Sequence, residues 1–223
     1  MEGIYEICAD LWVFDSDGTL YTNTAGVQRA IEKLMIEFVG RFYGVCYRDA
    51  ELLRKALLEK HKTKYTALAL RQEGIDISQF IRETYLAVSP EDYGINSSGT
   101  LLHTLSKLGG EKQVLTNNPS GFAMLILRAL GIEHLFSGIV GMEELGFILK
   151  PSPQAFSQLK LPLDRGMFVV VVDDSPENLH VARSMGCYTV LVGERHIKDE
   201  IADLHIKSLV EGVGDGRDNK CFV

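Results

Sequence analysis

Four short, uninterrupted apolar runs constrain the fold of this chain more than any other feature of its sequence. They lie at residues 11–15 (LWVFD), 113–116 (QVLT), 167–173 (MFVVVVD) and 188–192 (YTVLV). Runs without polar alternation are typical of strands that are buried on both faces of a parallel sheet. Because amphipathic stretches separate these runs, the pattern predicts an α/β fold whose sheet is covered by helices.

Three places in the chain combine a polar capping residue with a proline, at residues 118–119, 152–153 and 175–176. A capping side chain followed by proline predicts the start of a helix, and Gly131 and Gly186 predict the ends of the first and third of these helices. Two of the helices follow directly on predicted strands. Their N-termini should therefore lie at the carboxyl edge of the sheet, where α/β proteins bind ligands and where helix N-termini attract anions.

The sequence changes character between residues 21 and 99. Val27, Ile31 and Leu34 keep a helical spacing, and the amphipathic stretches after them contain no convincing strand. We therefore expect an all-helical subdomain at residues 21–99, inserted after the first strand of an α/β core domain that comprises residues 1–20 and 100–223.

The composition excludes several classes of protein. Hydrophobic residues make up 46% of the chain and charged residues 24%, as in ordinary globular proteins, and the formal net charge of −7 without a basic block counts against nucleic acid polymers as partners. The N-terminal stretch has neither a basic segment nor a long apolar run, so we expect a cytoplasmic protein without a membrane partner. The four cysteines form no C-x-x-C pair, which disfavours a zinc knuckle or a redox dithiol. The oligomeric state cannot be predicted from these features.

Two carboxylates, Asp15 and Asp17, stand one residue apart in DSDGT at residues 15–19, where the first predicted strand ends. As plain structure the pair is costly, because like charges repel and neither can be buried unpaired. A metal ion would remove that cost, whereas the plain alternative is a turn with aspartate caps, and the motif alone does not decide between them. The preceding strand and the missing Glu at the twelfth position disfavour an EF-hand.

Three later features support a site for a phosphorylated ligand. TNN at residues 116–118 offers a hydroxyl and backbone donors at a helix N-terminus, Lys150 is followed by the rigid segment 151–153 (PSP), and Asp173 and Asp174 form a second acidic pair. Each has a plain alternative, respectively a strand-end hydroxyl, a solvated lysine and an acidic helix start. Their occurrence together, in this order after DSDGT, argues against coincidence.

With these motifs the sequence resembles the haloacid dehalogenase-like superfamily of phosphohydrolases. The motifs are DSDGT at 15–19, VLTNN with Thr116, LKPSPQAF with Lys150, and VVVVDDSPEN with Asp173 and Asp174. The resemblance implies a Rossmann-like parallel sheet with a helical cap inserted after the first strand. The stretches HKTKYTALALRQEGI, VLTNNPSGFAMLILRALGIEHLF and DDSPENLHVARSMG look most like the pyrimidine 5′-nucleotidase branch.

The resemblance also implies a mechanism. Asp15 would attack the substrate phosphorus to form an aspartyl-phosphate, and Asp17 would protonate the leaving alkoxide and then deprotonate the hydrolytic water. The cofactor Mg²⁺ would be held by Asp15, the backbone carbonyl of Asp17, Asp174, and Asp173 directly or through water. The phosphoryl group would be bound by Thr116, Asn117, Gly18 and Lys150.

The predicted function is a Mg²⁺-dependent phosphomonoesterase that acts on a small phosphorylated metabolite, in particular a pyrimidine nucleotide 5′-monophosphate. Relatives that displace halide do not need the acid, so Asp17 favours phosphate over halide. The alternatives are a phosphomutase of the β-phosphoglucomutase type and a catalytically silent binding module on the same fold. The sequence departs from many relatives at Leu149, where they have glycine, and at the hydrophilic Ser16.

Overall fold

The computed structural model describes residues 4–22, 24–159, 166–193 and 202–210. The chain divides into two compact units. The core unit comprises Met1–Asn23 and Ile95–Val223, and the helical unit is Thr24–Gly94, which lies within the predicted insert of residues 21–99.

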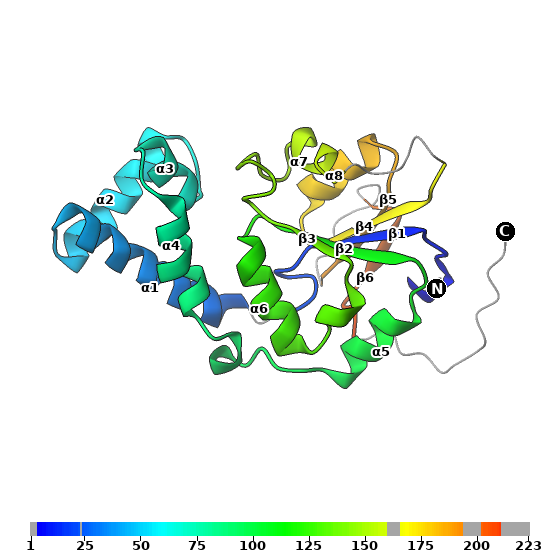
Figure 1. Cartoon of the computed structure of the whole chain (residues 1–223). Coiled ribbons are helices and arrows are strands. Elements are labelled where there is room, and N and C mark those ends of the chain that lie inside the picture. Colours follow the sequence, from blue (N-terminus) through cyan, green and yellow to red (C-terminus); the bar gives the residue numbers. More distant parts are fainter. Residues whose placement is uncertain (1–3, 23, 160–165, 194–201, 211–223) are drawn as a thin grey trace. The chain divides into compact units, whose positions relative to one another are not determined.

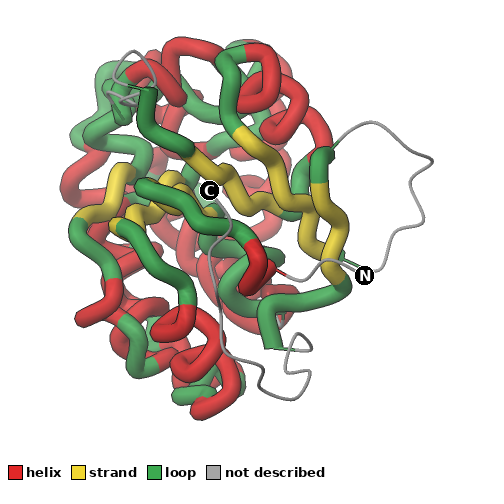
Figure 2. The backbone as a smooth tube through the Cα atoms, turned by 90° about the vertical axis from the view of Figure 1, so that its right-hand side faces the viewer, coloured by secondary structure: helices red, strands yellow, loops and turns green. Residues whose placement is uncertain are grey.

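The core unit is built on one six-stranded parallel sheet, which confirms the predicted α/β class (Figures 1 and 2). The strands are β1 (Leu11–Phe14), β2 (Glu111–Leu115), β3 (Gly138–Val140), β4 (Val169–Asp173), β5 (Tyr188–Val192) and β6 (Leu204–Ile206). Their order is β3-β2-β1-β4-β5-β6, so β1 lies in the interior of the sheet between β2 and β4. Every residue of β1 and β4 is buried, which explains their unbroken apolar runs.

Helices cover both faces of this sheet. They are η1 (Ile4–Glu6), α5 (Gly99–Lys107), α6 (Ser120–Leu130), η4 (Glu133–Leu135), α7 (Pro153–Ser157) and α8 (Pro176–Ser184). Figure 1 shows α6 on one side of the sheet and α7 and α8 on the other. Helix α8 packs on β4 and β5, and α6 packs on β3. The fully buried Phe122 and Ile126 of α6 and Leu179 of α8 anchor these contacts, since burial of apolar side chains is the main favourable term in packing.

All regular structure in the helical unit is helical. Its elements are α1 (Thr24–Tyr43), α2 (Tyr47–Lys60), α3 (Thr66–Gln72), α4 (Ile77–Glu83), η2 (Tyr85–Ala87) and η3 (Pro90–Tyr93). The rings of Phe38 and Phe80 meet edge to face with their centroids 5.2 Å apart, and Val39 and Leu70 are fully buried. The unit therefore has an apolar core of its own. No described helix of the chain is long and apolar enough to cross a membrane.

The structure corrects two details of the sequence interpretation. The four predicted strands are present as β1, β2, β4 and β5, but β3 and β6 were not predicted, because each has three residues and none is fully buried. The prediction that Asn118 caps a helix with Pro119 in its first turn was wrong. Helix α6 begins at Ser120 with Pro119 at the cap position, and the side chain of Asn118 bonds elsewhere. The predicted stop at Gly131 is confirmed by its left-handed φ of 72°.

Candidate active site

The predicted site residues follow strands that lie side by side. In the register of the sheet Phe14 is paired with Val172 of β4 and with Val114 of β2. Asp15 directly follows β1, and Asp173 is the last residue of β4. Because parallel strands end at the same edge, the sheet brings these carboxylates together at its carboxyl edge.

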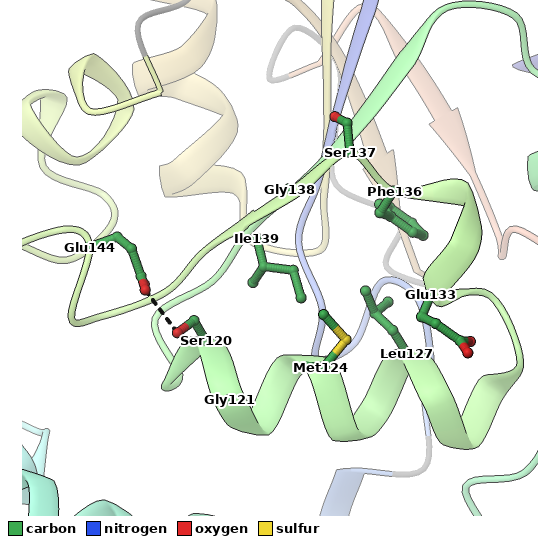
Figure 3. Close-up of a pocket in the computed structure, with 10 residues that line it drawn as sticks. All are labelled: Ser120, Gly121, Met124, Leu127, Glu133, Phe136, Ser137, Gly138, Ile139 and Glu144. Carbon is green, nitrogen blue, oxygen red and sulfur yellow. Dashed lines mark hydrogen bonds between the residues drawn. The ribbon is translucent and has the colours of Figure 1, made fainter.

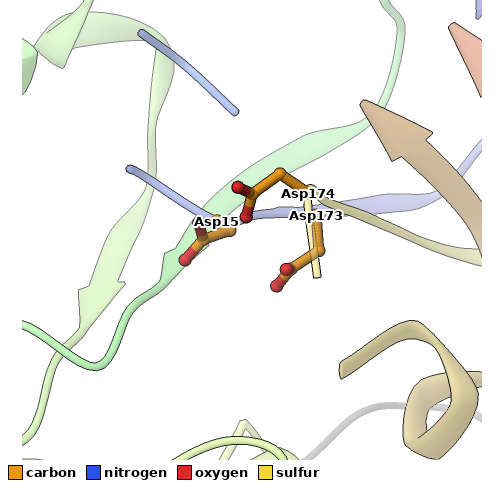
Figure 4. Close-up of side chains that lie close together, drawn as sticks. All are labelled: Asp15, Asp173 and Asp174. Atoms are coloured by element: carbon orange, nitrogen blue, oxygen red, sulfur yellow. The ribbon is translucent and has the colours of Figure 1, made fainter. Parts of the chain in front are cut away.

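Three carboxylates form an acidic cluster at this edge (Figure 4). One oxygen atom each from Asp15, Asp173 and Asp174 lies within 4.8 Å of the other two. Burial raises the pKa of Asp15 well above its usual range, and the negative charges of Asp173 and Asp17 act in the same direction. Burial and the charge of Asp173 also raise the pKa of Asp174. A site that resists ionisation in this way, and offers only oxygen ligands, could hold a hard divalent cation.

The ammonium group of Lys150 lies between two of these carboxylates. Its Nζ donates hydrogen bonds to Asp15 Oδ1 at 2.7 Å and to Asp173 Oδ2 at 2.8 Å, and the residue is only 4% exposed. Burial alone would lower the pKa of Lys150, but the attraction of the two carboxylates outweighs it, so the pKa is raised. Lys150 is therefore a permanent buried cation next to Asp15.

Asp173 is committed to hydrogen bonds on both of its oxygens. Oδ1 accepts from the Ser175 backbone N–H (2.9 Å) and from Asn178 Nδ2 (2.9 Å), while Oδ2 accepts from Asn178 Nδ2 (3.0 Å) and from Lys150. A carboxylate has about four lone-pair sites, and these contacts use all of them. Asn178, which lies on α8, was missed in the sequence analysis, although its place one helical turn beyond the acidic pair is a local signal.

The side chain of Asn117 holds the backbone of Lys150. Its Nδ2 donates to the Lys150 carbonyl at 3.0 Å, and its Oδ1 accepts from the Lys150 N–H at 2.8 Å. Thr116 is buried beside it, with its hydroxyl oxygen accepting the N–H of Asn118 at 3.1 Å. The amide side chain of Asn117 thus joins the end of β2 to Lys150, so a contact of Asn117 with phosphate would fall to its backbone.

The carboxylate of Asp17 is oriented differently from that of Asp15. Its Oδ1 accepts a hydrogen bond from the Tyr21 hydroxyl, its Oδ2 accepts one from Asn118 Nδ2 at 2.5 Å, and it is not a member of the acidic cluster. Burial raises the pKa of Asp17, although these two hydrogen bonds oppose the shift. Neither partner was predicted from the sequence to touch Asp17.

Gly18 is required at its position for two reasons. Its φ of +85° lies in the left-handed region, and a Cβ atom on this residue would lie 2.2 Å from Asp174 Oδ2. The absence of a side chain therefore allows Asp174 to approach the turn that carries Asp15 and Asp17.

A separate cavity of about 370 Å³ lies beside the edge strand β3, next to α6 and η4 (Figure 3). Its lining includes the apolar side chains of Met124, Leu127 and Ile139, and at one end Ser120 Oγ donates to Glu144 Oε1 at 2.9 Å. None of the predicted site residues lines it. The residues predicted to carry the chemistry therefore lie outside this cavity.

A family model and two curated proteins resemble this chain in sequence. A model of the haloacid dehalogenase-like hydrolase family matches residues 9–186. The chain is similar to a phosphoglycolate phosphatase of Pectobacterium atrosepticum, at 25% identity over 195 residues that cover 79% of this chain and 77% of that protein. It is 35% identical to a phosphoglycolate phosphatase of Pasteurella multocida over 92 residues, a match that spans only 40% of this chain and 40% of that relative.

Solved structures show the same fold. The crystal structure of a HAD phosphatase from Thermococcus onnurineus aligns with a TM-score of 0.58 at 19% identity, covering 91% of this chain and 95% of that one. At this identity the likeness concerns the fold alone. The family match, however, extends from just before β1 to just beyond α8, which is well over half of the sequence. The chain therefore belongs to the haloacid dehalogenase-like hydrolase family.

Proposed function

We propose that the protein is a Mg²⁺-dependent phosphomonoesterase that works through an aspartyl-phosphate on a small phosphorylated metabolite. The observation that carries the proposal is the buried Lys150 ammonium 2.7 Å from Asp15 Oδ1, beside two further carboxylates. A carboxylate nucleophile meets strong repulsion from a phosphate dianion, and an adjacent fixed cation reduces that repulsion. Phosphomonoester hydrolysis is very slow without a catalyst, and positioning with charge neutralisation is what it requires.

In the first step a carboxylate oxygen of Asp15 forms a bond to phosphorus while the bond from phosphorus to the leaving oxygen breaks. Asp17, in its protonated form, gives its proton to that leaving oxygen, so an alcohol departs. In the second step water attacks the phosphorus of the aspartyl-phosphate. Asp17 takes a proton from this water, inorganic phosphate leaves, and Asp15 is a carboxylate again.

Lys150 and Thr116 are proposed to hold the phosphoryl oxygens. The ammonium of Lys150 carries three donors, two of which bond to Asp15 and Asp173, so one remains for a phosphoryl oxygen. The Thr116 hydroxyl oxygen accepts from Asn118, which leaves the hydroxyl hydrogen to donate. The backbone of Asn117 is a further proposed phosphate contact. The Gly18 N–H donates to the Tyr21 carbonyl at 2.9 Å, so Gly18 supports the turn rather than binding phosphate through this group.

The acidic cluster fits the proposed cofactor, since three carboxylates offer the oxygen ligands that Mg²⁺ prefers. Asp15 and Asp174, with the backbone carbonyl of Asp17, would bind it directly. Asp173 would help directly or through water, in exchange for one of the hydrogen bonds that it accepts. When bound, Mg²⁺ would neutralise phosphoryl charge and orient the substrate. The local charge then favours an anionic substrate despite the net charge of −7.

The helical unit, within the predicted boundaries 21–99, is proposed to serve as a cap that excludes water and selects the leaving group. Two substrate classes are therefore to be compared first. The sequence resemblance favours a pyrimidine nucleotide 5′-monophosphate, and the names of the relatives add 2-phosphoglycolate. Both are alkyl phosphomonoesters, so both need a proton on the leaving oxygen.

The test is phosphate release from a panel that contains p-nitrophenyl phosphate, UMP, 2-phosphoglycolate and other metabolite monoesters, with Mg²⁺ and with EDTA. We expect turnover with Mg²⁺ that Asp15→Asn abolishes. Asp10→Asn is the matched control, since Asp10 precedes the same strand and accepts a hydrogen bond from the Phe168 N–H at 2.7 Å. No turnover across the panel by the wild-type protein would reject the proposal.

The same panel separates the alternatives. A phosphomutase of the β-phosphoglucomutase type would return the phosphoryl group to a sugar phosphate, so it would give sugar bisphosphate with little net phosphate. A silent binding module would bind ligand without turnover, and Asp15→Asn would leave that binding largely intact. The proposed hydrolase instead gives stoichiometric alcohol and phosphate.

A further inference from the structure

We propose that Tyr21 and Asn118 are positioning residues for Asp17, which together fix the direction from which its carboxyl group exchanges protons with the leaving oxygen and the attacking water. The proposal rests on the proposed function and extends it to two residues for which the sequence predicted no contact with Asp17.

The two residues hold Asp17 from different parts of the core unit. The Tyr21 hydroxyl donates to Oδ1 from the turn that follows β1, and Asn118 Nδ2 donates to Oδ2 at 2.5 Å from the segment that follows β2. A single hydrogen bond to one oxygen leaves the carboxylate free to rotate about that bond. Two bonds, one to each oxygen, fix both side-chain torsions, which is the geometric requirement for efficient proton transfer.

Tyr21 is itself held firmly. Its side chain is buried, with 7% of the residue exposed, and its carbonyl accepts the Gly18 N–H at 2.9 Å. Asp17 and Tyr21 also form an isolated β-bridge, so the turn between them is closed by backbone as well as by side chains. The hydroxyl therefore has one position from which to reach Asp17.

Asn118 is held in the same manner. Its N–H donates to Thr116 Oγ1 at 3.1 Å, and its carbonyl accepts the Met142 N–H at 2.9 Å. These bonds fix the backbone on which the amide is mounted. Since Asn118 does not cap α6, its side chain is available for the contact with Asp17.

The hydrogen bonds from Tyr21 and Asn118 keep Asp17 in a position to act as an acid. The charge of Lys150 attracts the Asp17 carboxylate, yet Lys150 bonds to Asp15 and Asp173, and Asp17 lies outside the acidic cluster. Without these two bonds the Asp17 carboxylate would rotate toward Lys150 and away from the leaving oxygen. Each carboxylate oxygen has two lone pairs, so one bond to each leaves room for the proton that is transferred.

A buried tyrosine hydroxyl also needs a partner for structural reasons alone, and the leaving group distinguishes the two roles. p-Nitrophenolate departs without protonation, whereas an alkoxide requires the proton of Asp17. A positioning role therefore predicts that loss of the Tyr21 hydroxyl lowers kcat/KM for alkyl esters more than for aryl esters. A purely structural contact predicts equal losses for both esters.

The experiment compares kcat/KM of the wild type and Tyr21→Phe on p-nitrophenyl phosphate and on the best alkyl monoester of the panel. We expect a loss of about ten-fold on the alkyl ester and less than about two-fold on the aryl ester. Tyr5→Phe is the matched control, because Tyr5 donates its hydroxyl to Thr104 Oγ1 at 3.0 Å in the same unit, and it should leave the ratio unchanged. Asn118→Ala provides a second variant with the same expected selectivity.

A double variant tests whether the effect passes through Asp17. In an Asp17→Asn background, Tyr21→Phe should cause no further loss of kcat/KM on the alkyl ester, where the single substitution is expected to cost about ten-fold. Equal losses on both esters, or a full additional loss in that background, would overturn the positioning role while leaving the phosphatase proposal intact. Absence of any turnover by the wild type would instead reject the proposed function, and this inference with it.

Discussion

The amide side chain of Asn117 and the backbone of Lys150 are joined by two reciprocal hydrogen bonds, at 3.0 and 2.8 Å. The two residues lie 33 positions apart in the chain, and the pair connects the end of β2 to the segment that carries the buried ammonium group. The position of Lys150 relative to Asp15 is therefore set by a contact with the neighbouring strand end as well as by its own ion pairs.

Asn117→Ala should remove both hydrogen bonds and loosen Lys150 without removing its charge. We expect kcat/KM for phosphate esters to fall by about ten-fold, and the free energy of unfolding to fall by about 1–3 kcal/mol because two backbone groups lose their partner. Steady-state kinetics and urea unfolding measure the two effects. Gln113→Ala is the matched control. It removes an exposed hydrogen bond to Glu111 on the same strand and should change neither kcat/KM nor the free energy of unfolding. Normal kinetics of Asn117→Ala would contradict the role of Asn117 in holding Lys150.

Gly18→Ala should damage metal binding more than stability. The new Cβ would meet Asp174 Oδ2 at 2.2 Å and push this carboxylate away from Asp15. Gly186→Ala is the matched control, because its φ of +92° imposes similar backbone strain while nothing lies within 4 Å of the added Cβ. Isothermal titration with Mg²⁺ should show at least about ten-fold weaker binding for Gly18→Ala alone. Equal affinities of the two variants would show that Asp174 is not required at this place.

The positions of the carboxylates at the strand ends were predictable because the sequence signals for them are local. Unbroken apolar runs identify β1 and β4 as buried parallel strands, and the carboxylates at their ends must then lie at one edge of the sheet. The short strands β3 and β6 carry no such run, since their burial depends on the neighbours they pair with.

The supporting contacts could not be predicted in the same way. Asn118 and Asp17 are 101 positions apart in the sequence. They lie close in space only because β1 and β2 pair in one particular register. Spacing along the chain favoured a helix cap for Asn118 instead. Tyr21 and Asn178 lie four and five positions from the carboxylates they hold, so a search for donors near each aspartate would have found them.

Mg²⁺ should stabilise the protein, and the effect should weaken as pH falls. The raised pKa values of Asp15 and Asp174 mean that the metal-free folded state holds protons which the unfolded chain has already lost. The contribution of these two groups to stability in EDTA is then fully present below the ordinary aspartate pKa and is lost as pH rises through their folded pKa values. Mg²⁺ offsets this decrease, by about 2.7 kcal/mol at a hundred times its Kd, but must compete with protons at low pH.

Thermal unfolding with Mg²⁺ or EDTA, in a pH series from about 4.5 to about 8, measures this linkage. Asp174→Asn should remove most of the Mg²⁺-dependent increase in Tm, and Asp10→Asn should retain it. An increase that is independent of pH, or that survives in Asp174→Asn, would contradict metal binding by the acidic cluster.

Lys150→Met should destabilise the metal-free protein strongly at neutral pH and less at acidic pH. Loss of the ammonium leaves Asp15 and Asp173 buried without their cation, at a cost of about 3 kcal/mol, with kcat/KM reduced at least about a hundred-fold. Since Lys150 lowers the pKa of Asp15, its removal raises that pKa further, and the folded variant takes up a proton as pH falls.

Urea unfolding in EDTA at about pH 5 and about pH 7 tests the sign of this effect. Lys112→Met is the matched control, because the buried Lys112 ammonium donates to the carbonyls of Leu108 (2.7 Å) and Gly110 (3.2 Å). Burial lowers the pKa of Lys112 from 10.5, and the control should show the same loss at both pH values. A Lys150→Met loss of stability that does not shrink at the lower pH would contradict the role of Lys150 in keeping Asp15 ionised.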